Sequence, residues 1–160
     1  MNPEVEIYTK ELRRLFQRLS ELLDGLSEQE LNYHPPVAEA NSIYALATHT
    51  LGNVRAWILG ICCGHPIERD RPAEFRALGR DATPIVDNAR SLLEEIELSL
   101  RALQPESLDD LREPRQQLWG AGTSRAVTGR EAILHAVAHA AEHVGHIGLT
   151  RDLAKAALGT

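Results

Sequence analysis

A twelve-residue stretch near the end of the sequence carries four histidines and one acid. In order they are His135, His139, Glu142, His143 and His146. Successive residues of an α-helix are turned by about 100°, so these five side chains would spread over only about 100° of one helical face. His139 and His143 would stand one turn apart, which lets two imidazoles reach a single ion. The spacing therefore indicates a metal site rather than four unrelated packing histidines.

The segment around these residues, from Thr128 to Ala156, is predicted to form one long helix. Thr128 is followed three residues later by Glu131, a capping-box pattern that marks a helix start, and no proline follows. The opposite side of this helix is built of small residues that would let a neighbouring helix approach closely: Val137, Ala140, Ala141, Val144 and Gly148.

Another histidine, His49, interrupts an apolar pattern in the second turn of a helix predicted to start at Asn41 or Ser42 and to end at Gly64. Taken alone, such a histidine is typical of a buried polar residue that a neighbour satisfies. A histidine pair elsewhere that needs a third ligand makes His49 a candidate ligand as well. The positions that share its face are small and leave room in front of the imidazole: Ala45, Gly52, Asn53 and Ala56.

Four segments must position these residues. In the first three, apolar residues recur at intervals of three and four, as in amphipathic helices, and the fourth is the capped histidine segment. The segments are 3–23, 42–64, 83–103 and 128–156. A further helical turn is expected at SEQEL, and Thr83 is expected to cap the third segment. The expected fold is all-α, a four-helix bundle with long crossover connections that forms a single domain over residues 1–160. The connections 65–82 and 104–127 are expected to roof the site.

Composition and charge exclude several classes of partner. The net charge is −6 and no basic run is longer than Arg13–Arg14, which argues against nucleic acid. The longest apolar run, 56–64, is far short of the ~20 residues that span a bilayer, and MNPEVEIYTK lacks a signal-peptide pattern. We therefore expect a cytoplasmic protein with no membrane partner.

The adjacent Cys62 and Cys63 fit neither a disulfide framework nor a CxxC metal motif, so a reduced, buried pair is expected.

Two motifs together resemble the DinB-like, or YfiT-like, metalloenzyme family. They are the histidine in ATHTLGNVRAW and the HxxxH pair followed by xGxI in HAVAHAAEHVGHIGLTR, and the resemblance spans the chain in helix order. It implies that His49, His139 and His143 bind one metal. Some members of the family are S-transferases or isomerases that use low-molecular-weight thiols. Where the family typically has HxxHHxGQI, this sequence has HxxEHVGHI, so Glu142 and His146 replace a histidine and a glutamine beside the expected metal.

A competing motif starts at His139. Residues 139–143 fit HxxEH, the inverted zinc-protease signature, in which the glutamate is the general base for water. Only seventeen residues follow His143 and none is a glutamate, so the downstream acidic ligand of that class is missing. A helical chain also offers no edge strand on which to align a peptide. Proteolysis is not favoured, but Glu142 is kept as a candidate catalytic base for hydrolysis of small molecules.

The resulting hypothesis is an enzyme with a three-histidine site and open coordination positions. Such a site suits zinc or nickel best and ferrous iron next, and the metal would ionise either a thiol or a water. The resemblance favours a thiol S-transferase that acts on small electrophiles with a low-molecular-weight thiol as cosubstrate. The alternatives are a metal-dependent hydrolase that uses Glu142 and a non-catalytic metal- or ligand-binding bundle. His135 and His146 are expected to tune turnover or affinity, and His34 and His65 to be loop residues. A homodimer is the assembly considered.

Overall fold

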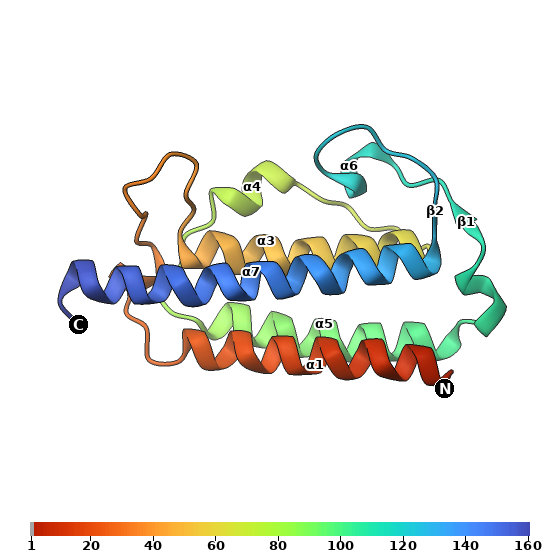
Figure 1. The fold of residues 1–160 in the computed structure, drawn as a ribbon, viewed down its shortest axis with the longest axis horizontal. Coiled ribbons are helices and arrows are strands. Elements are labelled where there is room, and N and C mark those ends of the chain that lie inside the picture. Colours follow the sequence, from red (N-terminus) through yellow and green to blue (C-terminus); the bar gives the residue numbers. More distant parts are fainter. Residues whose placement is uncertain (1) are drawn as a thin grey trace.

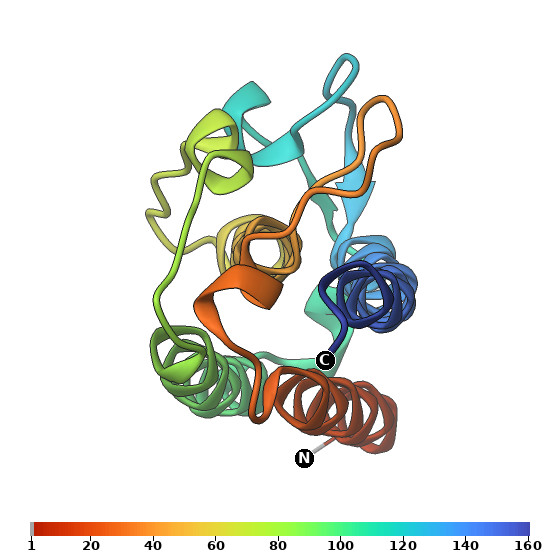
Figure 2. The same cartoon turned by 90° about the vertical axis from the view of Figure 1, so that its left-hand side faces the viewer.

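Four long helices enclose one apolar core in the computed structural model, which describes residues 2–160. They are α1 (Pro3–Leu23), α3 (Ile43–Val54) with its direct continuation η1 (Arg55–Cys62), α5 (Thr83–Ala102) and α7 (Gly129–Leu158). Seen end on, they stand at the four corners of a bundle, with α1 between α5 and α7 (Figure 2). The predicted all-α four-helix bundle is confirmed.

The connections place short elements over one side of this bundle. Helices α1 and α7 run in one direction and α3 and α5 in the other, so the chain crosses back along the bundle between α3 and α5 (Figure 1). That crossover contains α4 (Arg71–Phe75), whereas the connection from α5 to α7 starts and ends at the same end of the bundle. The remaining short elements are α2 (Glu28–Leu31), η2 (Pro105–Leu108), β1 (Leu111–Arg112), α6 (Gln116–Trp119) and β2 (Val127–Thr128).

Strands β1 and β2 pair antiparallel, with Leu111 opposite Thr128 and Arg112 opposite Val127. No strand was predicted, because a two-residue ladder is too short to show alternation in the sequence. The helical turn expected at SEQEL is present as α2, which begins after the cap residue Ser27.

Side chains at the helix starts explain most of the boundaries. Ser42 accepts a hydrogen bond from the backbone N–H of Ala45, and Thr128 and Glu131 form the predicted reciprocal capping box. The prediction for Thr83 was wrong. Helix α5 begins at Thr83 itself, its N-cap residue is Ala82, and no side chain caps it. The N–H of Thr83 donates to Asp81 Oδ1 at 2.8 Å.

The second long helix departs from α geometry over its last eight residues. After Val54 it continues as η1, which is eight residues of π-helix. At its end, the N–H of Cys63 donates a hydrogen bond to the carbonyl of Ile58, five residues earlier, at 2.9 Å. π-Turns are uncommon and concentrate at functional sites. The sequence predicted one uniform helix here, since apolar spacing cannot separate 3.6 from 4.4 residues per turn over two turns. The cysteines that end η1 are free, with Cys62 buried and Cys63 half-buried, as predicted.

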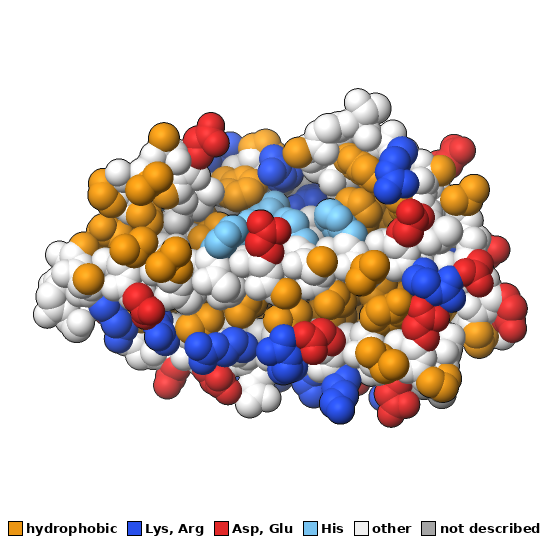
Figure 3. Space-filling view, in the orientation of Figure 1, with side chains coloured by type: hydrophobic (Ala, Val, Ile, Leu, Met, Phe, Trp, Pro, Cys, Tyr) orange, Lys and Arg blue, Asp and Glu red, His pale blue; other side chains and the backbone are white. Residues whose placement is uncertain are grey.

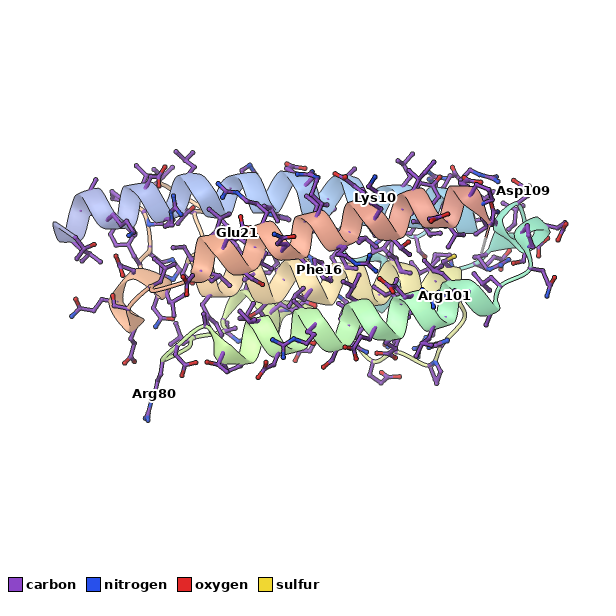
Figure 4. All side chains as sticks on the ribbon, turned by 90° about the horizontal axis from the view of Figure 1, so that it is seen from below. Lys10, Phe16, Glu21, Arg80, Arg101 and Asp109 are labelled. Carbon is purple, nitrogen blue, oxygen red and sulfur yellow. The ribbon has the colours of Figure 1, made fainter. Side chains whose placement is uncertain are left out.

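The apolar sides of the helices face inward. Phe16 lies between the helices and is buried, whereas Lys10, Glu21 and Arg101 lie on the surface (Figure 4). On α7, Ala140 and Val144 are buried as predicted, but Ala141 is exposed. Among residues 2–160, no helix combines the length and the apolar character that a bilayer crossing requires.

Candidate metal centre

Three histidines meet where α3 and α7 pack against each other. The Nε2 atom of His139 lies 3.2 Å from Nε2 of His49 and 3.2 Å from Nε2 of His143. One ligand atom from each of the three residues lies within 4.8 Å of the other two. His139 and His143 are one turn apart on α7, and the neighbouring α3 brings His49 to them. The histidines gather in a hollow of the surface along α7 (Figure 3).

A carboxylate behind His49 fixes the orientation of its ring. Glu74, on α4 in the crossover, accepts a hydrogen bond from Nδ1 of His49 at 2.7 Å. The same carboxylate accepts bonds from Nε and Nη2 of Arg69 at 2.8 and 3.0 Å. Because Nδ1 of His49 carries the proton, its Nε2 presents a lone pair toward His139 and His143. Carboxylate–histidine pairs of this kind are typical behind metal-ligating imidazoles.

The contact between Glu74 and helix α3 depends on a glycine. A Cβ atom on Gly52, one turn after His49, would lie 2.2 Å from Oε1 of Glu74. The side chains of His49 and Arg69 are each 3% exposed, so this hydrogen-bonded group is almost entirely shielded from solvent. The ring of Phe75 stacks on His49 with the centroids 4.3 Å apart and closes the remaining face.

Sequence reasoning did not find Glu74 or Arg69. The crossover has no periodicity and was interpreted as a connection, so nothing local marks which of its charges turns inward. The one signal was the row of small residues beside His49. That row was interpreted as open room in front of the imidazole, whereas at Gly52 the room is filled by the Glu74 carboxylate.

The electrostatics favour neutral imidazoles. Burial, and then the charge of His143, lowers the pKa of His139 to about 3, and burial followed by the charge of His49 lowers the pKa of His143 to about 4. Burial acts to raise the pKa of Glu74, but the hydrogen bonds from His49 and Arg69 outweigh it and hold this pKa below its usual value. At neutral pH the site therefore presents His139 and His143 as neutral imidazoles, and Glu74 as an ionised carboxylate.

This donor set fits a divalent transition metal. Zinc–nitrogen bonds of 2.0–2.1 Å in tetrahedral geometry would separate two ligand nitrogens by about 3.3–3.4 Å. The two Nε2 pairs are 3.2 Å apart. Within residues 2–160, the buried Nδ1 atoms of His139 and His143 also have no hydrogen-bond partner. Three nitrogens facing one another cannot all be satisfied by shared protons, whereas one cation would accept a lone pair from each.

The other predicted residues surround this cluster. His135 stacks on Trp57 with the ring centroids 3.7 Å apart, and its ring lies 5.7 Å from that of His139. His146 lies next to His143, at 5.5 Å between ring centroids. Glu142 is exposed, and no hydrogen bond joins it to a histidine of the described chain. Its charge nevertheless acts to raise the pKa of His143.

The histidines predicted to be loop residues, His34 and His65, lie in the loops before α3 and before α4.

A cavity of about 560 Å³ opens beside the cluster. His49 and His139 form part of its wall, and η1 contributes Trp57. The roof comes from the crossover and from the α6 region, through Arg71 and Trp119. The expectation that the long connections cover the site is confirmed.

The four-helix bundle is the fold of DinB-like proteins of known structure. The sequence also matches the family model described as mycothiol-S-transferase over residues 9–156. The chain belongs to this family. None of the curated proteins is similar enough in sequence to give a match.

Solved structures agree on the fold. A DinB-like protein from Bacillus cereus superposes with a TM-score of 0.71 at 15% identity, covering 93% of this chain and 91% of that one. A conserved protein from Enterococcus faecalis gives 0.69 at 18% identity, covering 97% of both chains. The mycothiol-dependent maleylpyruvate isomerase gives 0.63 at 13% identity and covers 90% of this chain but 60% of its own.

Proposed function

We propose that this protein is a metal-dependent thiol S-transferase. In this proposal His49, His139 and His143 hold one divalent metal, zinc or nickel before ferrous iron, and a low-molecular-weight thiol is transferred to a small electrophile. The convergence of three Nε2 atoms beside a cavity whose wall includes His49 and His139 carries the proposal. The family to which the chain belongs, described as mycothiol-S-transferase, supplies the reaction class.

The side chains divide the work between holding the metal and shaping its surroundings. A divalent metal, when bound, supplies a Lewis acid that lowers the pKa of a coordinated thiol. His139 and His143 are neutral at pH 7 and need not lose a proton first. Glu74 and Arg69 keep the ring of His49 in one orientation and one tautomer. These residues would therefore bind the metal without rearrangement.

The transfer step balances with two reactants. The thiol loses its proton, its sulfur forms a bond to carbon, and the displaced electron pair leaves with a leaving group or is protonated at the adjacent carbon. The cavity beside the histidines is large enough for a small electrophile. Mycothiol is the proposed thiol, on the strength of the family description and of the mycothiol-dependent isomerase with the same fold.

The hydrolase alternative receives less support from the geometry. A general base must reach the water it deprotonates, and Glu142 is exposed and does not contribute to the cavity wall.

A cytoplasmic location is part of the same proposal, because free cysteines such as Cys62 and Cys63 are typical of a reducing compartment.

Thiol conjugation tests the proposal. The protein loaded with zinc or nickel is mixed with mycothiol and 1-chloro-2,4-dinitrobenzene, and the thioether is followed by absorbance and identified by mass spectrometry. We expect conjugation above the uncatalysed rate for wild type and for the control His34→Ala, and a loss of both metal and conjugation for His139→Ala. Full metal occupancy in His139→Ala would refute the ligand set. A metal-loaded wild type that conjugates none of mycothiol, glutathione and cysteine would favour the binding bundle.

A further inference from the structure

Two residues that line the cavity beside the histidines each carry a buried polar atom with no hydrogen-bond partner among the described residues. Within residues 2–160, the buried side-chain atoms without a hydrogen-bond partner include Oδ1 of Asn53 and Nε1 of Trp57. Both residues line the cavity, and they are only 4% and 3% exposed. A buried polar group without a hydrogen-bond partner destabilises the folded protein. Two of them on one wall indicate that a polar ligand completes this site.

The charges of the wall favour an anionic ligand. Three arginines line the cavity, and two of them already have carboxylate partners: Arg69 binds Glu74, and Arg125 lies 3.7 Å from Glu131. Among the ion pairs formed by the described residues, none includes Arg71. Arg71 is also half-buried. It is therefore a partly buried cation without an acidic partner among the described residues, in a protein whose net charge is −6. A cation at a partly desolvated concave surface attracts anions more strongly than one on an open surface.

The position of Arg71 is fixed by its neighbours. Its guanidinium carbon lies 4.9 Å from the centroid of the Phe75 ring, and that ring stacks on His49. One aromatic ring therefore separates the arginine from the proposed metal ligand. On the other side, the α6 backbone approaches closely at Gly120, where a Cβ atom would lie 3.5 Å from Cδ of Arg71. The contacts on both sides position the side chain beside the cavity.

The rest of the wall suits a flat, partly apolar body. The rings of Trp57 and Trp119 lie 4.9 Å apart between centroids, and His135 stacks on Trp57. Trp57 is covered by these rings, whereas Trp119 is half-buried and lines the cavity, and an indole binds planar unsaturated groups by stacking. A carboxylate at one end of such a group would meet Arg71.

We propose that this cavity binds the electrophile of the transfer reaction, and that this electrophile is a small planar carboxylate whose anion pairs with Arg71. The amide of Asn53 and the indole N–H of Trp57 bind further polar atoms of the same molecule. The assignment rests on the S-transferase proposal for its reaction. Addition of a thiol to an unsaturated carboxylate needs no further reactant. The sulfur–carbon bond forms, the carbon–carbon π bond breaks, and the adjacent carbon takes up the proton that the thiol released.

Binding is tested by tryptophan fluorescence. The chain has two tryptophans and both line this cavity, so the intrinsic emission reports on the site. The protein as purified, without thiol, is titrated with benzoate and with its neutral counterpart benzamide. We expect saturable binding of benzoate, and an affinity about 10- to 100-fold lower in Arg71→Gln, since a hydrogen-bonded charge pair contributes about that factor. The matched control is Arg76→Gln, an exposed arginine that follows α4 and does not line the cavity.

Turnover supplies the second readout, with monomethyl fumarate and dimethyl fumarate as acceptors for mycothiol. Arg71→Gln is expected to raise the KM for the monoanion about 10- to 100-fold and to leave the neutral diester unchanged. Equal binding of benzoate and benzamide by wild type would overturn the assignment, as would a rise in the KM for the thiol in place of the acceptor. If benzoate binding depends on Arg71 but no thiol is transferred, the S-transferase proposal fails and the anion site stands. If the diester is conjugated but no anion is preferred, only the anion site fails.

Discussion

Replacing Glu74 with Gln tests the support behind the metal centre. The change keeps the shape of the side chain but removes the charge that accepts bonds from His49 and Arg69. Loss of an outer partner of a ligating histidine typically lowers metal affinity about 10- to 100-fold, or about 1.4–2.7 kcal/mol. The change also leaves the Arg69 guanidinium, with its side chain 3% exposed, without its counter-charge. Removing one member of a buried pair costs about 3–5 kcal/mol of unfolding free energy.

The assay is competition for zinc between the protein and a chromophoric chelator, with circular dichroism to show that each variant is folded. Glu68→Gln is the matched control, since Glu68 lies in the same connection with its side chain 81% exposed. Gly52→Ala is a second probe that leaves both charges in place but directs a methyl group at the Glu74 carboxylate, 2.2 Å from Oε1. We expect both Glu74→Gln and Gly52→Ala to weaken zinc binding. A folded Glu74→Gln protein that binds zinc within about twofold of Glu68→Gln would refute the supporting role.

The remaining predictions concern titration and the outer residues of the histidine face. His139 and His143 have pKa values of about 3 and 4, below the unfolded value of 6.5, so the unfolded state binds protons first as the pH falls. The unfolding free energy of the metal-free protein, measured with urea, should therefore fall from pH 6.5 toward pH 4. We expect a slope of up to roughly 1 kcal/mol per pH unit for each of the two histidines, because solvent screens part of the effect. His139→Gln should show a smaller slope. Glu142→Gln should retain the metal, and its rate of thiol conjugation should fall by less than about tenfold. If its rate of ester hydrolysis alone falls by about 10²- to 10⁴-fold, the hydrolase alternative is supported instead. His135→Ala and His146→Ala should change turnover or affinity by about 10- to 100-fold while the metal is retained, and loss of metal as complete as in His143→Ala would redraw the ligand set.

The helices could be predicted from the sequence because their signals are local. The spacing of apolar residues and the caps at Ser42 and Thr128 each act within a few residues, and the structure confirms them. The pairing of His139 with His143 follows from one helical turn in the same way. The place of His49 opposite that pair came from its isolation in an apolar pattern together with the family resemblance.

The residues that support the site could not be predicted, because their contacts are tertiary. Glu74 reaches His49 from a connection without periodicity, and only Gly52 left a trace of that contact in the sequence. The cap of α5 was misassigned because Thr83 is a good capping residue by type, whereas the helix takes Ala82 as its N-cap residue and includes Thr83 in its first turn. Whether Arg71 has an acidic partner depends on where the other charged side chains lie in the folded protein. No local sequence pattern predicts this.

The central claim is that the three histidines bind one metal and that this metal is needed for thiol transfer. Metal-free protein is titrated with zinc or nickel, and the rate of mycothiol conjugation is recorded at each addition. The account predicts no conjugation without metal and a linear rise that breaks at one equivalent per chain. Conjugation at full rate in the metal-free protein, or one bound equivalent with no conjugation, would contradict it.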